Sequence, residues 1–458
     1  MTFLKALKVT TASIALCVGA PSFATTLTDA LIQAYQTNPS LRIGQNSLRA
    51  TDEGVAQARG ALRPTISATA STNRTLNETT DRASSSDTAA LTTSVPIYAG
   101  LTGLNGVDQA KFNVQASRQA LVDTEQTVLL NAVTAYMDVR RDQRNVELAR
   151  NSVKVLSEEV RAARERFEVG EVTRTDVSQA ESRFAASQSS LETSRAALKR
   201  SIDFYIATIG SAPKNLRTPP PAPKLPKSAN DAENIAIARN PQILQQQFLV
   251  KAAEKSVDIA RGNKRPTITG SISAQQSNAD LTDTSDTSAI LGLSVSQPIF
   301  QGGRLNSAER QALAQLDQEK SELQLAGVQV RQEVQSAYAT WEASKASIRA
   351  RREQVRAAKI AFEGTSEEAK LGARTTLDAL NAEQELLEAR SDLVSAIRDE
   401  YVNAYTVLSA MGLLTVDHLQ LGIETYNPDT NYSAVAKPSP LGKKRLDTLD
   451  KILKRNGK

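Results

Sequence analysis

The sequence has few of the residues that carry redox, metal or nucleophilic chemistry. Its 458 residues include one cysteine, one histidine and one tryptophan, and aromatic residues make up 4% of the total. Cys17 lies within the first 24 residues, so a chain without that segment can form neither a disulfide nor a thiolate metal site. His418 stands outside any catalytic or ligand cluster, and the carboxylates are scattered as solvated side chains usually are. These absences argue against an enzyme and against a bound cofactor or metal.

The chain also lacks a hydrophobic run of the roughly 20 residues that a transmembrane helix needs. Its apolar run over residues 9–20 is shorter, follows Lys5 and Lys8, and precedes Ser22-Phe23-Ala24, an A-x-A-like cleavage site. This pattern predicts a secretory signal peptide over residues 1–24 rather than a membrane anchor.

Charge is nearly balanced over the whole chain. There are 55 basic and 50 acidic residues, a formal net charge of +5, and eight of the basic residues lie in the tail at 437–458. A basic tail can bind nucleic acid or anionic lipid. In an exported protein we interpret it as a solvated, mobile end, and we expect no nucleic acid as a partner.

What the sequence does contain is an internal repeat with a spacing of 202 residues. The stretch "ARGALRPTISATA" at 58–70 returns as "ARGNKRPTITGSI" at 260–272. We therefore predict repeat 1 at 25–210, a stiff Pro-rich linker at 211–228, repeat 2 at 229–412, and a C-terminal segment at 413–458. Matching pairs at the same spacing include Asn38 and Asn240, Tyr136 and Tyr338, Gly170 and Gly372, Asp176 and Asp378, and Glu181 and Glu383.

Each repeat contains two segments in which apolar or small residues alternate with polar ones. They predict β-hairpins at 64–98 and 266–300, each with one apolar face and one small, polar face. Runs of about 10 residues suit tilted strands that cross a bilayer, although a soluble sandwich has the same pattern. The residues expected on the apolar faces are Ile66, Ala68, Ala70, Leu91, Val95, Ile268, Gly270, Ile272, Leu291, Leu293 and Val295.

Four strands are too few to close a barrel, and an open sheet edge is not tolerated in lipid. If the strands enter a membrane, several chains must complete the barrel together. A trimer would give twelve strands, an even number within the range known for such barrels.

The rest of each repeat predicts very long helices. Residues 107–169 contain neither glycine nor proline, and a continuous helix of that length would extend ~95 Å. Apolar residues seven apart continue on both sides of Gly170, which predicts a coiled-coil hairpin with its tip near 170, and the second copy places a tip near 372. Gly327 and Gly364 are expected sites of local bending. Such slender rods require lateral neighbours to bury much surface.

Together these features resemble the TolC family of bacterial outer-membrane efflux and type I secretion channel proteins. The likeness is specific at "ALIQAYQTNPSL", "SQPIFQGGRLN", "VGEVTRTDVSQAE" and "LGARTTLDALNAE", and "YNPDTNY" is similar to members that serve type I secretion. The resemblance implies an α+β homotrimer, in which a 12-stranded outer-membrane β-barrel continues into a periplasmic α-helical barrel of a Gram-negative bacterium. It also implies a passive exit duct that contacts outer-membrane lipid, a periplasmic adaptor and an inner-membrane transporter, either ABC-type or proton-driven.

The resemblance further implies a periplasmic gate at the hairpin tips. Arg374, two residues past a turn glycine, would pair with Thr175 and Asp176 and hold neighbouring hairpins shut, with about 1 kcal/mol per subunit. Asp378 and Asn381 stand where the family has two acidic residues at the narrowest point. A ring of three Asp378 carboxylates would raise their pKa values and attract cations, whereas Asn381 would weaken block by divalent cations.

The remaining tip residues resemble an edge on which an adaptor docks. The family's gating tyrosine would fall at Ala369, so a second latch is absent or built differently. The predicted docking residues are Gly170, Glu171, Val172, Thr173, Gly372, Ala373 and Thr375.

One other class of protein fits the helices. A periplasmic adaptor or scaffold made of helical hairpins, without a pore, would share the long coiled coils. It would have no use for two alternating strand pairs, so the strands favour the duct. The cargo stays open between small drugs and secreted proteins, with a lean to proteins from the tail motif.

Overall fold

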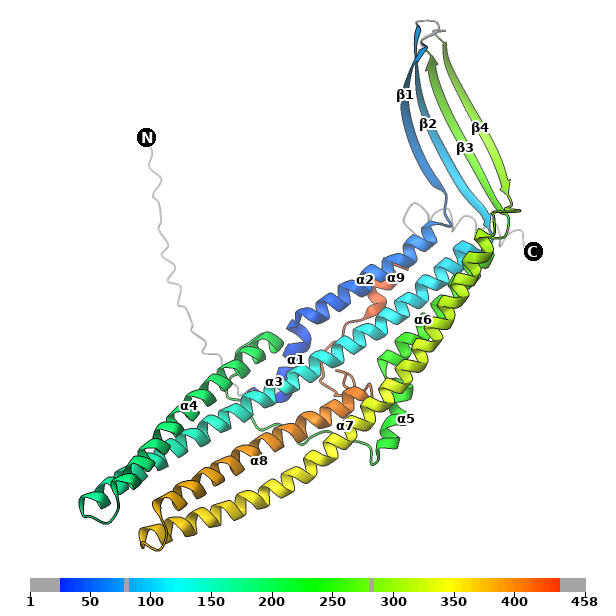
Figure 1. The fold of residues 1–458 in the computed structure, drawn as a ribbon. Coiled ribbons are helices and arrows are strands. Elements are labelled where there is room, and N and C mark those ends of the chain that lie inside the picture. Colours follow the sequence, from blue (N-terminus) through cyan, green and yellow to red (C-terminus); the bar gives the residue numbers. More distant parts are fainter. Residues whose placement is uncertain (1–24, 78–81, 280–283, 437–458) are drawn as a thin grey trace, which may run out of the picture.

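The computed structural model describes residues 25–77, 82–279 and 284–436. The predicted signal peptide and the basic tail lie outside the described residues. Figure 1 shows a long rod of helices with a β-sheet at one end and two helical turns at the other. The termini of the described chain lie along the side of the rod.

The elements of the second half repeat the order of the first. Corresponding helices begin 202 residues apart, as do β1 and β3 and also β2 and β4. The first half contains α1 (Leu27–Thr37), α2 (Pro39–Gly60), β1 (Thr65–Asn77), β2 (Arg82–Ala99), α3 (Thr102–Glu168) and α4 (Arg174–Ile209). The second contains α5 (Ala229–Arg239), α6 (Pro241–Gly262), β3 (Thr267–Ala279), β4 (Thr284–Ser296), α7 (Arg304–Lys370) and α8 (Thr376–Ala410), and α9 (Pro428–Ala436) follows.

The repeated Asn-Pro dipeptides begin α2 and α6. Asn38 caps α2 by accepting a hydrogen bond from the backbone N–H of Ser40, and proline occupies the first helical position. The Asn38 amide also donates to the Thr208 carbonyl at 3.0 Å. Asn240 makes the equivalent bonds to Gln242 and Ala410. One dipeptide therefore starts a helix and ties it to the end of a long helix that lies 170 residues further along the chain.

The helices α3 and α7 each have 67 residues, which corresponds to ~100 Å. The helix α3 begins at Thr102, earlier than the Gly-free run predicts, and includes Gly103 and Gly106. Gly327 and Gly364 lie inside α7 without interrupting it. Their predicted role as sites of local bending stays a prediction.

The sheet is antiparallel throughout, in the order β1-β2-β3-β4. Cross-strand partners lie on the same face, and Ile66 pairs with Thr93, Ala68 with Leu91, and Ile272 with Leu291. Registry therefore places the residues expected to be apolar on one face, and small polar residues such as Ser271 on the other. Within the described part of the chain, β1 and β4 each have a strand neighbour on one side only.

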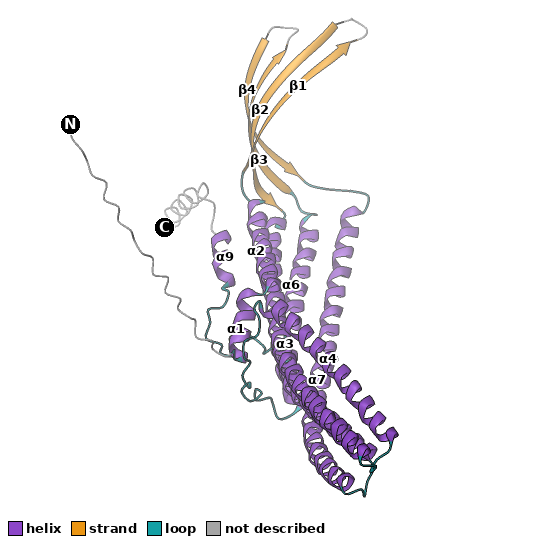
Figure 2. Ribbon diagram, turned by 90° about the vertical axis from the view of Figure 1, so that its left-hand side faces the viewer, coloured by secondary structure: helices purple, strands orange, loops and turns teal. Residues whose placement is uncertain are grey.

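The main hydrophobic core lies in the middle of the rod, where α1 and α5 pack against the long helices. Tyr136, Tyr205 and Leu129 are fully buried there. The proline-rich linker wraps this level, because the hydroxyls of Tyr136 and Tyr401 donate to the Arg217 and Pro220 carbonyls at 2.7 and 3.0 Å. In Figure 1 the linker is the green loop that runs from α4 to α5, and Figure 2 shows from another side that the strands and the helical turns lie at opposite ends of the rod.

Candidate functional site

The two helical turns at the end of the rod are built alike. Gly170 (φ 80°) and Gly372 (φ 75°) have left-handed backbone conformations that favour glycine. After each turn a threonine caps the next helix. The Thr173 hydroxyl donates to Asp176 Oδ2 at 2.7 Å and accepts from the Asp176 N–H at 3.3 Å. Such a capping box fixes the direction in which the chain enters α4.

Thr375 and Asp378 form the same box at the start of α8, with the hydroxyl and carboxylate oxygens 2.7 Å apart. The hydrogen bonds from Thr173 and Thr375 hold the pKa values of the Asp176 and Asp378 carboxyls below their usual value. Sequence reasoning assigned both acids to the gate and missed the caps. The Thr-x-x-Asp spacing was the available signal.

The tips also expose apolar side chains. Val169 and Leu371 are 71% and 84% exposed, directly before the two turn glycines. Of the predicted docking residues, Glu171, Thr173, Ala373 and both turn glycines are exposed, as is Thr375, while Val172 is half-buried. Sequence reasoning missed Val169 and Leu371, although their spacing of 202 residues marked them.

The predicted gate residues have partners within one chain. The Arg374 guanidinium forms an ion pair with Glu368, with Nε and Oε2 3.1 Å apart. Asn381 accepts a hydrogen bond from Arg183 of α4 at 2.8 Å. Thr175 is exposed and Ala369 is half-buried. The latch between Arg374 and Asp176 stays a prediction about hairpins that pack together in an assembly.

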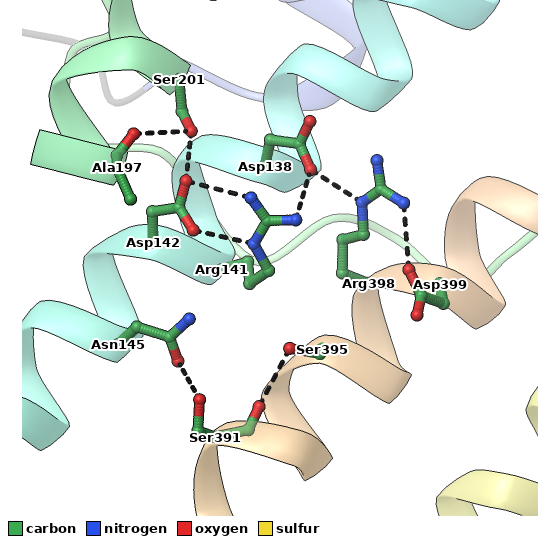
Figure 3. A network of polar contacts seen from close by, with 10 residues as sticks. All are labelled: Asp138, Arg141, Asp142, Asn145, Ala197, Ser201, Ser391, Ser395, Arg398 and Asp399. Atoms are coloured by element: carbon green, nitrogen blue, oxygen red, sulfur yellow. Dashed lines mark hydrogen bonds and ion pairs between the residues drawn. The ribbon is translucent and has the colours of Figure 1, made fainter. Parts of the chain in front are cut away.

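A seam joins the α3/α4 hairpin to α8 above the tips. In Figure 3, Arg398 of α8 contacts Asp138 of α3 at 2.8 Å, and Arg141 bridges Asp138 and Asp142. The Ser201 hydroxyl of α4 donates to Asp142. One ionic network therefore ties three helices together where the hairpins leave the core.

The seam continues toward the tips. The Ser391 hydroxyl of α8 donates to Asn145 of α3 at 3.2 Å. Nearer the tips, Leu380 of α8 is buried in a cluster with Leu156, Val160 and Ala180 of the first hairpin. Polar ties and apolar packing therefore alternate down the seam.

Within the described residues, no group of three or more His, Cys, Asp or Glu side chains could hold a metal ion. In the same part of the chain, no helix combines the length and apolar character that membrane crossing requires. The features that distinguish this molecule are the sheet, the rod and the tips.

Comparison with known proteins gives consistent relatives. The family model described as "Outer membrane efflux protein" matches residues 30–202 and 234–413. The chain is 37% identical over 419 residues to the outer membrane efflux protein BepC of Brucella suis, covering 91% of this chain and 92% of that protein. It is 26% identical over 442 residues to the outer membrane protein TolC of Escherichia coli, covering 90% and 88%.

Solved structures share the fold. The CmeC outer membrane channel of Campylobacter jejuni superposes with a TM-score of 0.75 at 17% sequence identity, covering 90% of this chain and 89% of that one. At this identity the likeness concerns the fold alone.

Proposed function

This chain belongs to the outer membrane efflux protein family and is an outer-membrane exit duct; we propose that three copies form one continuous channel from the periplasm to the outside. The observation that carries the proposal is a four-stranded sheet with two open edges on top of a rod that is too thin to enclose a lumen.

The edges of the sheet require partners. An unpaired strand edge exposes backbone N–H and C=O groups, each of which costs several kcal/mol in lipid unless it is paired. Joining β4 of one copy to β1 of the next satisfies both edges. Three copies would then close a barrel of twelve strands, of a size known in outer membranes.

The apolar face of the sheet fits an environment of lipid. Leu91, Leu291 and Leu293 lie exposed on this face, where water would surround them in a soluble protein. Ile299 and Phe300 are 88% and 85% exposed where the sheet joins the helices. Aromatic and apolar residues at that level suit the membrane interface.

The tips suit a docking role. Val169 and Leu371 present apolar side chains, framed by the exposed polar Glu171 and Thr173. We assign this edge to a periplasmic adaptor, and we assign the supply of energy to an inner-membrane transporter. A wide, water-filled lumen makes few specific contacts with a substrate that passes through it. The inner-membrane transporter therefore selects the cargo.

Two measurements test the duct. The full-length chain, purified from outer membranes in mild detergent, should have the mass of three subunits, and on gels it should run as a slower band before heating than after heating, which separates the subunits. In planar bilayers it should conduct ions. A single-chain mass, recovered from the soluble periplasm without conductance, would contradict the proposal and favour the helical scaffold.

The gate requires a separate comparison, because Arg374 already has a partner in its own hairpin. If Arg374 latches onto Asp176 of another hairpin, Arg374→Ala should raise single-channel conductance while Glu368→Gln leaves it near that of the wild type. Equal conductance in Arg374→Ala and the wild type would remove the latch. Equal increases in both variants would assign the effect to the Arg374–Glu368 pair within one hairpin.

The predicted Asp378 ring has its own test. Asp378→Ala should weaken inhibition of the channel by divalent cations. The control Glu363→Ala, which removes an exposed carboxylate from α7, should leave the inhibition unchanged.

A further inference from the structure

A cavity interrupts the seam between the two hairpins. It has a volume of about 280 Å³ and is lined by side chains of α3, α4 and α8, among them Ser152, Arg183 and Leu387. The Arg183–Asn381 hydrogen bond and the cluster around Leu380 lie on its tip side. A change inside the cavity therefore acts on the last contacts that hold the hairpins together before the tips.

Glu383 projects into this cavity from α8. The residue is 8% exposed, and its Oε2 is buried without a hydrogen-bond partner. The Ser152 hydroxyl of α3 lies close enough to interact with the carboxyl, but it completes no hydrogen bond of good geometry. A buried carboxylate with an unsatisfied oxygen is costly, and protonation removes its charge.

The matching glutamate of the first repeat behaves differently. Glu181 lies on the surface and accepts hydrogen bonds from Arg164 at 2.5 and 3.1 Å. The residue 202 positions after Arg164 is Ser366, so Glu383 has lost this cationic partner. The same residue type thus occurs once with its charge compensated and once buried.

Burial affects the pKa of Glu383 more than the charged groups around it do. Arg183 faces the cavity from α4 and Glu388 from α8, whereas the described lining residues from α3 are uncharged and none comes from α7. Burial raises the pKa of Glu383 above its ordinary value of 4.5, and Ser152 and Arg390 oppose this rise to a smaller extent. Neutral Glu383 is therefore compatible with a closed seam, and ionised Glu383 is not.

We propose that Glu383 is a proton-sensitive wedge that lets the α7/α8 hairpin close on α3/α4 when neutral and parts the two hairpins when ionised. Ionisation would draw water into the cavity, which has room for several molecules at about 30 Å³ each. Hydration weakens the packing around Leu380, where α8 is buried against the first hairpin. The inference rests on the proposed function in that parting the hairpins opens the tips.

The sign of the pH effect is fixed by the raised pKa. The seam should be tightest below pH 4.5 and should loosen as the pH rises through the higher value in the folded protein. The test uses pulsed electron paramagnetic resonance on the assembled full-length protein. Spin labels at Glu171→Cys and Ala373→Cys report the distance between tips, in assemblies where labelled subunits are diluted by unlabelled ones. Cys17 is the sequence's single cysteine and lies in the predicted signal peptide, so no other site competes for the label.

The distance should lengthen as the pH rises in the wild type, and Glu383→Gln should keep the short distance at every pH. The matched control, Glu181→Gln, should retain the full shift. Identical shifts in Glu383→Gln and the wild type, or no shift in the wild type, would overturn the wedge. Conductance is measured in parallel, so a channel whose tip distance ignores pH refutes the wedge and leaves the duct intact. A tip distance that depends on pH in a protein that does not conduct would refute the duct and leave the wedge intact.

Discussion

The helices α3 and α7 have the same length and corresponding positions in the two halves, yet they differ in what covers them. Of 67 residues each, 19 are buried in α3 and 8 in α7. The helix α3 packs against α2, α4, α6 and α8, whereas the main contacts of α7 are with α5, α6 and α8. The helix α3 is therefore surrounded by other helices, whereas α7 lies at the edge of the single chain.

In the proposed trimer, the difference marks the face of α7 that a neighbouring copy would cover. The helix α7 leaves Leu325 and Val328 exposed by 53% and 60%, one turn apart on the same face. Ile360 is exposed farther down the same helix. A second copy that covers this face would give α7 the burial that α3 obtains within its own chain.

The largest expected effect comes from placing charge on that face. Leu325→Glu should prevent trimer formation, because an unpaired charge buried in an interface costs about 3–5 kcal/mol. Light scattering of the detergent-solubilised protein measures the mass. Helix content by circular dichroism should stay near that of the wild type, since the Leu325 side chain is more than half exposed in the single chain.

The matched control is Gln324→Glu, one position earlier and also exposed, but rotated by about 100° around the helix. It should remain trimeric. If Leu325→Glu also gives trimers, α7 is not the interface helix, and its exposed apolar residues need another explanation.

The second comparison concerns Glu125 of α3, which corresponds to Gly327 of α7. Burial raises the pKa of Glu125 to about 7, although its Oε1 accepts a hydrogen bond from the Val416 N–H at 2.7 Å. Because the folded pKa exceeds the unfolded one, this group's stabilisation is complete below pH 4.5 and is lost as the pH rises through about 7. The total loss is about 3 kcal/mol.

Glu125→Gln keeps the acceptor and removes the charge, so the fall in melting temperature over this pH range should become smaller by the share that Glu125 contributes. Glu147→Gln, on the exposed part of the same helix, should leave the fall unchanged. A wild-type melting temperature that is flat from pH 4.5 to 7 would show that Glu125 ionises freely.

A smaller effect is expected from the ionic tie between hairpins, which occurs once per chain because Ala196 and Thr340 stand at the positions equivalent to Arg398 and Asp138. Arg398 and Asp138 are mostly buried, with side chains 21% and 18% exposed. Arg398→Ala should lower the free energy of unfolding in urea by about 2 kcal/mol. Arg195→Ala, which breaks the exposed pair with Glu192, should lower it by less than about 1 kcal/mol. Equal losses of unfolding free energy in the two variants would mean that solvent screens the Arg398–Asp138 ion pair.

The alternation in the sequence indicated which residues share a face of the sheet, because the register places Ile66, Leu91 and Ile272 together, although Ile290 lies on the opposite face from Leu291. The sequence was insufficient for the start of α3. Glycine lowers helix propensity by about 1 kcal/mol, so Gly103 suggested a later start. In the structure Leu62 packs where a Gly103 side chain would lie, with its Cδ2 2.4 Å from that position, so packing outweighs propensity.

The positions of the tip residues followed from the repeat, but their partners did not. Glu181 and Glu383 look equivalent in the sequence, but Glu383 is buried beside α3 residues such as Ser152, which is more than 200 residues away along the chain. Arg374 could be expected near the tip, whereas its ion pair with Glu368 depends on how the turn brings the end of α7 to the start of α8. Such pairings are set by packing in space.

The smallest expected effect tests whether the tips themselves differ. Thr173→Ala and Thr375→Ala each remove a capping box of nearly identical geometry, which should destabilise the first turn of α4 or α8 by about 1 kcal/mol. Amide hydrogen exchange in each turn should then accelerate roughly fivefold, since 1.4 kcal/mol corresponds to a factor of ten. Equal acceleration would place the asymmetry between hairpins in the seam, where Glu383 and Glu181 differ. A much larger change at Thr375 would place it in the tip instead, because α8 would then depend on its cap more than α4 does.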